Sequence, residues 1–118
     1  MAGKSGVTMQ TLRVLAVMLE EPTEPRYGLQ LSGATGLKSG TLYPILARLE
    51  AAGWVESDWE TQAAAALGRP RRRYYRLTGV GAEAAQAEVQ QVTAIWAATT
   101  RRLLPVVGSL RPAGGGVT

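Results

Sequence analysis

The hydrophobic period of the sequence changes at Gly53, and this change restricts the possible folds more than any other feature. Before it, in KSGTLYPILARLEAAG, Leu42, Ile45, Leu46 and Leu49 fall at helical spacing, which predicts an amphipathic helix. After it, in WVESDWE, the period is two, so that successive side chains point to opposite faces, which predicts a strand. The chain must therefore pass directly from a half-buried helix into a sheet.

The ends of this helix carry their own signals. Ser39 or Thr41 is the expected N-cap, and Gly53 is the expected left-handed stop. Pro44 has no N–H to donate and fits most easily in a first turn, which favours a start near Thr41 or a strained first turn.

A second strand is predicted from Arg71 to Leu77, joined to the first by the flexible, small-residue connection TQAAAALG. Tyr75 and Leu77 share a face and are expected to be buried. Arg72 and Arg76 are on the other face, where cross-strand pairs are expected with three acidic residues. These acidic residues are Glu56, Asp58 and Glu60. Trp54 and Trp59 are interpreted as packing residues at the base of the hairpin.

Two further helices precede this unit. Thr8 is expected to cap a helix that runs to about Glu20, and its wide apolar surface predicts burial on more than one side, including by a second subunit. A short helical segment begins at Tyr27 and ends at Gly33 and Gly36.

A last long helix is expected to be capped by Thr78, to reach roughly Leu104 and to be closed by Pro105. Its apolar or small residues alternate in steps of three and four, the spacing of a coiled-coil seam. They are Ala82, Ala85, Val89, Val92, Trp96, Thr99 and Leu103. Gly79 and Gly81 weaken its first turn and leave no capping box.

The positive charge of the chain is concentrated in one stretch. Lys and Arg number 13 against nine Asp and Glu, and five of the arginines lie in GRPRRRYYRL, residues 68–77. Acidic residues slightly outnumber basic ones in the rest of the chain. A protein that binds a polyanion concentrates its charge in this way.

The chain contains neither Cys nor His, which excludes disulfides, Cys/His metal sites and His-dependent nucleophiles. The nine carboxylates form no pair by spacing, so we expect no enzyme, no metal and no cofactor. Without disulfides or a signal peptide, the expected location is cytoplasmic. The apolar run from Val14 to Leu19 is too short to span a bilayer, so no membrane partner is expected.

These elements together predict a mainly α protein with a small β-hairpin: a winged helix-turn-helix plus a C-terminal dimerisation helix. The DNA-binding domain is expected over 7–78, the dimerisation helix over 79–104 and a flexible tail over 105–118. The face of the second helix of the motif opposite its buried leucines carries small residues, so its backbone could approach a major groove. These small residues are Gly40, Pro44, Ala47 and Ala51.

Three blocks of this sequence, YGLQLS, SGTLYPILARLEAAGWVESDW and GRPRRRYYRLT, resemble in order the PadR family of bacterial transcriptional regulators, over about residues 8 to 85. The resemblance implies a homodimeric winged-helix repressor whose third helix enters the major groove while its wing holds the minor groove or backbone. It also implies, as for many members, a small aromatic effector that releases the protein from DNA. The single C-terminal helix resembles that of the family's smaller subgroup. Gly79 departs from the family's usual Glu.

We therefore predict double-stranded operator DNA, a second copy of the chain and a small-molecule effector as partners, and no membrane. The residues predicted to contact DNA are Tyr27, Lys38, Ser39, Gly40, Thr41, Tyr43, Pro44, Arg48, Arg69, Arg71, Arg72 and Arg73. Arg69, Arg71 and Arg73 are included because they lie nearer the wing tip, where no acidic residue is expected to pair with them. Tyr43 could equally pack against a neighbouring element, and Arg48 could pair with an acidic neighbour.

The residues predicted at the dimer interface are Met9, Leu12, Val89, Val92, Trp96 and Leu103. Trp96 has two interpretations, a dimer-core aromatic or one wall of a cavity that stacks a planar ligand. Two alternatives to a DNA-binding repressor stay open: a winged-helix module that binds only protein, and a small carboxylate-based hydrolase, for which no pair of acids stands out.

Overall fold

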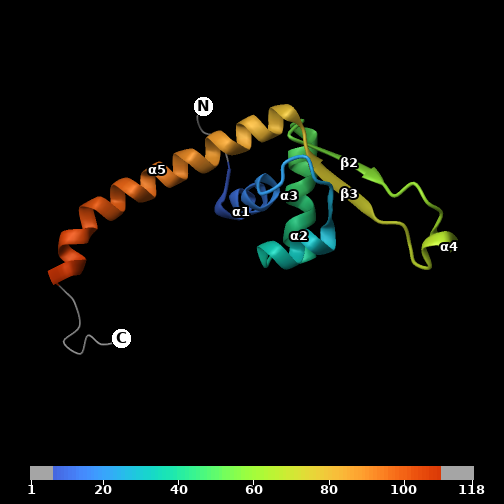
Figure 1. Ribbon diagram of the computed structural model, residues 1–118, viewed down its shortest axis with the longest axis horizontal. Helices are drawn as coiled ribbons and strands as arrows, with labels where there is room; N and C mark the ends of the chain where they lie inside the picture. The colour runs from blue at the N-terminus through green and yellow to red at the C-terminus, as the bar shows by residue number, and fades with distance from the viewer. Residues whose placement is uncertain (1–6, 110–118) are drawn as a thin grey trace.

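The computed structural model describes residues 7–109. Its elements are, in chain order, α1 (Met9–Leu19), β1 (Arg26–Tyr27), α2 (Gly28–Thr35), α3 (Ser39–Ala51), β2 (Val55–Trp59), α4 (Ala64–Leu67), β3 (Arg73–Leu77) and α5 (Gly79–Ser109). Figure 1 shows α1, α2 and α3 gathered in a central body, with the β2–β3 wing reaching out on one side and α5 on the other. The predicted fold, mainly α with a small hairpin in a winged helix-turn-helix, is confirmed.

Helix α1 forms the centre of the core. Val14 and Leu15 are fully buried, and α1 packs against α2, β3 and α5 of its own chain. Leu12 is also buried, whereas Met9 is 63% exposed. Burial of α1 on more than one side is confirmed, because α5 folds back over it within the same chain, and the expected contribution of a second subunit stays a prediction.

The sheet has three antiparallel strands in the order β1-β3-β2. Tyr75 and Leu77 of β3 are buried, as their alternation predicts. Strand β1 was not expected, because two residues are too short to display a period. Its pairing with β3 sets Tyr27 opposite Tyr74 and so ties the start of α2 to the wing.

Helix α3 begins earlier than expected. Its N-cap is Lys38, which makes no side-chain cap bond, rather than Ser39 or Thr41. Pro44 therefore lies in the second turn, where the Gly40 carbonyl loses its amide donor; Gly40 is exposed, so that carbonyl can be hydrated.

The C-terminus of α3 follows its sequence signal. Gly53 is left-handed (φ 81°), and the amides of Gly53 and Trp54 donate to the carbonyls of Glu50 and Leu49, at 3.0 and 2.9 Å. This crossed pair of bonds is a Schellman motif, and it turns the chain from α3 into β2.

Helix α5 starts against that same turn. The Thr78 hydroxyl caps it by accepting from the Gly81 amide at 2.9 Å, as predicted, and donates to the Gly53 carbonyl at 2.7 Å. A Cβ at Gly81 would lie 2.6 Å from the carbonyl carbon of Trp54. The glycine that weakens the first turn of α5 is therefore required by the close approach of Trp54.

One expectation about the C-terminal part of the chain is corrected. Helix α5 continues through Pro105 to Ser109 instead of ending there; the missing N–H of Pro105 affects the carbonyl of Arg101, an exposed residue where water can replace it. Of the predicted tail, 105–109 are thus helical and 110–118 lie outside the described residues. The connection between the strands contains the single helical turn α4, ended by left-handed Gly68, and its expected flexibility stays a prediction.

No helix within residues 7–109 combines the length and the apolar character needed to cross a membrane.

Candidate nucleic-acid interface

The exposed face of α3 is built as its periodicity predicts. Its leucines and isoleucine face the core, and Gly40, Pro44, Ala47, Arg48 and Ala51 are exposed on the other side. The side chains near the middle of this face are small, so the helix backbone can come close to a surface. Lys38 and Ser39 are exposed at its N-terminal end, and Thr41 is half-buried.

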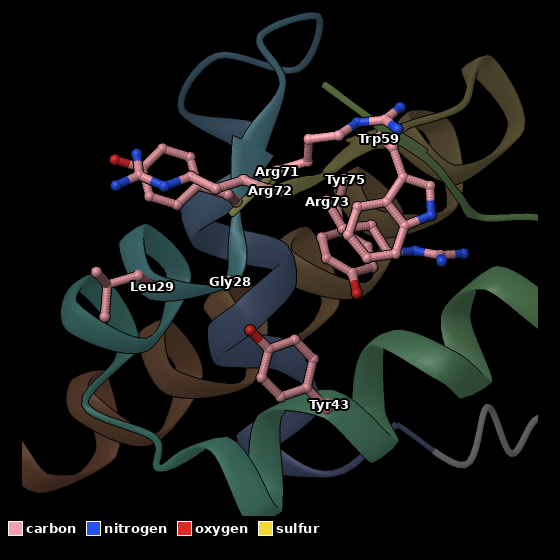
Figure 2. A pocket seen from close by; sticks show the side chains of 9 residues that line it. Gly28, Leu29, Tyr43, Trp59, Arg71, Arg72, Arg73 and Tyr75 are labelled. Carbon is pink, nitrogen blue, oxygen red and sulfur yellow. The ribbon is translucent and has the colours of Figure 1, made fainter. Parts of the chain in front are cut away.

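A hollow of about 390 Å³ lies between this helix and the wing. Figure 2 shows its walls: Gly28 and Leu29 at the start of α2, Tyr43 on α3, and Trp59 with three arginines on the wing side. The arginines are Arg71, Arg72 and Arg73, and Tyr27 and Tyr75 complete the lining. The hollow thus combines aromatic walls with positive charge, which suits a phosphate backbone.

Tyr43 packs against neighbouring elements, which is one of its two predicted roles, and its contact with DNA stays a prediction. Its hydroxyl points at Gly28 (Figure 2), where a Cβ would lie 2.6 Å from the ring carbon that carries the hydroxyl. Its ring centroid is 6.5 Å from that of Tyr75. The ring nevertheless stays 44% exposed. Gly28 is therefore the residue that allows α3 to pack this tyrosine against the start of α2.

Tyr27 is held at the same place from the β1 side. Its amide donates to the Gln30 side chain at 3.0 Å, and its ring meets that of Tyr74 edge to face at 5.7 Å. The guanidinium of Arg72 lies over the Tyr27 ring, 4.2 Å from its centroid. Among the residues that the structure describes, no carboxylate pairs with Arg72.

Glu60, which directly follows β2, is hydrogen-bonded to four other residues of the wing. Its carboxylate accepts from both terminal nitrogens of Arg69 (2.7 and 2.9 Å), from the Arg72 amide (2.8 Å) and from the Tyr74 hydroxyl (3.2 Å). Its backbone carbonyl accepts from Nε of Arg71 at 2.8 Å. We call these five residues the Glu60 cluster. The Arg69 guanidinium is the main cause that lowers the pKa of Glu60 to about 2, and burial, followed by the Glu60 carboxylate, raises the pKa of Tyr74.

A second network joins α3 to the wing. The Ser57 hydroxyl donates to Glu50 at 2.7 Å and accepts from Nε of Arg73 at 3.0 Å. A terminal nitrogen of Arg73 lies 3.8 Å from the Glu50 carboxylate, and its guanidinium lies 5.5 Å from the Trp59 ring. The C-terminal half of α3 and both long strands are thereby linked through polar side chains.

The sequence prediction for the wing arginines is partly confirmed. Arg76 pairs with Glu56 at 3.2 Å, as the predicted face implies. The expectation that acidic partners run out near the tip is wrong for Arg69, because the loop folds back and brings it to Glu60. It is wrong for Arg73 too, because Glu50 approaches from α3 rather than from the hairpin.

Three residues at this surface were missed. The interpretation of Trp59 as a packing residue is wrong, since it is 49% exposed and lines the hollow. Glu60 was expected only as a cross-strand partner of Arg72 or Arg76, and Glu50 was not expected here at all, because the loop path brings Arg69 to Glu60 and the packing of α3 against the wing brings Arg73 to Glu50. The one available signal was Glu60 itself, an acid placed where the first strand ends.

The residues predicted at a dimer interface are divided between two places. Leu12 is buried within the chain, and Val89 and Val92 are half-buried on α5. Trp96 and Leu103, farther along α5, are 61% and 49% exposed, and Ile95 and Leu104 beside them are each 58% exposed. This outer part of α5 projects from the body in Figure 1.

Comparison with known proteins places this geometry in a family. The model of the "Transcriptional regulator PadR-like family" matches residues 14–87. A PadR family transcriptional regulator from Eggerthella lenta is 28% identical, with 77% of this chain and 80% of that chain aligned and a TM-score of 0.59. A PadR-like regulator from Bacillus cereus is 26% identical, with coverage of 80% and 89% and a TM-score of 0.58. No curated protein matches.

Proposed function

The chain belongs to the PadR-like family of transcriptional regulators, and from this we propose that it is a homodimeric repressor of an inverted-repeat operator. Membership confirms the expectation of a DNA-binding regulator rather than an enzyme. The observation that carries the proposal is the exposed small-residue face of α3 beside the arginine-lined hollow.

In this proposal the two surfaces have separate tasks. Helix α3 enters the major groove, where Thr41, Tyr43 and Arg48 reach base edges and phosphates. The wing lies along the backbone, and a phosphate strand passes through the hollow between Tyr43 and the wing arginines. Residues 7–78 are thus the DNA-binding part, and α5 is the dimerisation part.

Dimerisation is supported by the outer part of α5. Ile95, Trp96, Leu103 and Leu104 form an apolar stretch that no other described element covers. A second copy of α5 would bury it, and two-fold symmetry would then place two α3 helices about one turn of DNA apart.

We also propose that a small-molecule effector releases the protein from DNA, which is supported by the family resemblance. An exposed Trp96 from each subunit would offer a flat surface for a planar aromatic ligand. Binding there would favour one relative orientation of the two subunits and so alter the separation of their α3 helices.

The proposal is tested by selecting bound sequences from a pool of genomic fragments and then measuring Kd on the selected site and on random DNA. We expect tighter binding to the selected site and a steep loss of affinity as salt rises. Arg48→Ala should lower the preference for the selected site, whereas Arg101→Ala, on exposed α5, should leave it unchanged. Equal binding to both DNAs would favour a protein-binding winged helix instead.

A further inference from the structure

We propose that the arginines of the wing act in two distinct ways, an inference that rests on the proposed DNA binding. Arg71 and Arg72 contact phosphates. Arg69 and Arg73 are positioning residues, held by Glu60 and Glu50, and do not contribute their charge to DNA. This divides a cluster that sequence alone treats as one basic surface, and it makes two acidic residues necessary for binding a polyanion.

Arg69 is already engaged in the protein. Both of its terminal nitrogens bond to the two oxygens of Glu60, at 2.7 and 2.9 Å, and the Glu60 side chain is only 11% exposed. Such a bidentate pair is among the strongest side-chain interactions, and its net charge is zero. A DNA phosphate would have to displace a carboxylate that also fastens the Arg72 amide and the Tyr74 hydroxyl.

Arg73 is engaged differently, across two elements. Its Nε bonds to Ser57 on β2, while its terminal nitrogen lies near Glu50 on α3 and its plane lies beside Trp59. These contacts set the angle between the wing and α3. The interaction with Glu50 is half-exposed and 3.8 Å long, so its role is to orient the groups rather than to add much stability.

Arg71 and Arg72 remain available. Arg71 is exposed, and among residues 7–109 its side chain donates only one hydrogen bond, from Nε to the Glu60 carbonyl, which leaves its terminal nitrogens for a ligand. The guanidinium carbon of Arg72 lies over the Tyr27 ring, 4.2 Å from its centroid, and this contact does not use up the N–H groups of the guanidinium. Both line the hollow beside α3, as Arg73 does, but unlike Arg73 neither pairs with a carboxylate among residues 7–109.

The first test counts phosphate contacts. The slope of log Kd against log salt should fall by about 0.9 for Arg71→Gln and for Arg72→Gln, because each removes one counterion-releasing contact. Arg69→Gln and Arg73→Gln should weaken binding without changing the slope. Equal slope losses for all four variants would overturn the division.

The second test uses the sign of an effect. Removing an acidic charge near DNA should tighten binding, and Asp58→Asn serves as the control, since the Asp58 carboxylate bonds only to the adjacent Trp59 amide among the described residues. Glu60→Gln removes the same charge from the same strand region, yet it should weaken binding about five- to tenfold, because the arginines lose their fixed positions. Tighter binding by Glu60→Gln, as by Asp58→Asn, would refute the positioning role.

A third variant separates charge from geometry. Arg69→Lys keeps the charge but cannot form the two-pronged bond, so it should behave like Glu60→Gln. Amide exchange at Arg72, measured without DNA, should accelerate in Glu60→Gln and Arg69→Lys but not in Asp58→Asn. Wild-type binding to the selected site is measured first: its absence would refute the proposed function, whereas normal wild-type binding with contrary variants would refute only this inference.

Discussion

Glu60 is hydrogen-bonded to four other residues of the wing, and its titration gives a prediction. Its pKa is lowered from 4.5 to about 2 in the folded chain, mainly by Arg69. A lowered pKa means that Glu60 stabilises the fold fully above pH 4.5 and loses this effect as the pH falls toward 2. The gap in unfolding free energy between wild type and Glu60→Gln should therefore be constant down to pH 4.5 and then shrink.

Urea unfolding of both proteins at a series of pH values measures this gap. Asp58→Asn is the matched control, because Asp58 has no arginine partner among the described residues, and it should differ less from wild type. A gap that is the same at pH 7 and pH 3 would show that the bonds to Glu60 do not stabilise the fold.

Gly81 provides a prediction about packing. Alanine is the better helix former by about 1 kcal/mol, yet Gly81→Ala should destabilise the protein by about 1–3 kcal/mol, since its Cβ would meet the backbone of Trp54. Gly79, in the same helical turn, has open space around it, so Gly79→Ala should be neutral or slightly stabilising. Thermal unfolding of the two variants measures the contrast, and equal effects would mean that α5 can move away from Trp54.

At the scale of elements, the outer part of α5 predicts self-association. Trp96→Arg places a charge in the exposed apolar stretch and should convert a dimer to a monomer in sedimentation velocity. Gln91→Arg introduces the same charge at an exposed polar position that helical geometry puts on nearly the opposite side of α5, and it should remain dimeric. A Trp96→Arg protein that stays fully dimeric would remove Trp96 from the interface.

The elements predicted well are those whose hydrophobic pattern or capping residue can be seen within a short stretch of the sequence. The 3.6-residue pattern of α3, the alternation of β3 and the caps Thr8 and Thr78 are local signals, and each is confirmed. Strand β1 has only two residues and exists because β3 offers its edge. Helix α4 lies in a run of alanines, for which the small-residue composition predicted a flexible connection and not a helical turn.

The candidate site was only half predictable for a related reason. The exposed face of α3 depends on which residues of one helix are buried, and the sequence contains that information. The partners of Arg69 and Arg73 depend on where a loop returns and how α3 sits on the wing, which involve residues nine and 23 positions apart. Ion pairs between residues so far apart in the sequence cannot be inferred from the local hydrophobic period.

At the scale of the whole molecule, the chain is elongated, with extents of 63 × 39 × 24 Å, because the wing and α5 project from opposite sides of the body. A dimer joined through α5 would hold its two α3 helices at a fixed separation. Inserting about five base pairs between the operator half-sites should therefore abolish dimer binding, and inserting about ten should partly restore it. Mobility-shift titrations on the spaced operators measure this, and indifference to spacing would indicate independent monomers.

The turn at Gly53 and Trp54 has a mechanical consequence. The same few backbone groups end α3, begin β2 and receive the first turn of α5 through Thr78 and the gap left by Gly81. Helix α5 is therefore about 46 Å long, and its first turn contacts the residues that directly follow α3, the helix that we propose to read DNA. We therefore expect a change in the direction of α5 to change the orientation of α3 as well.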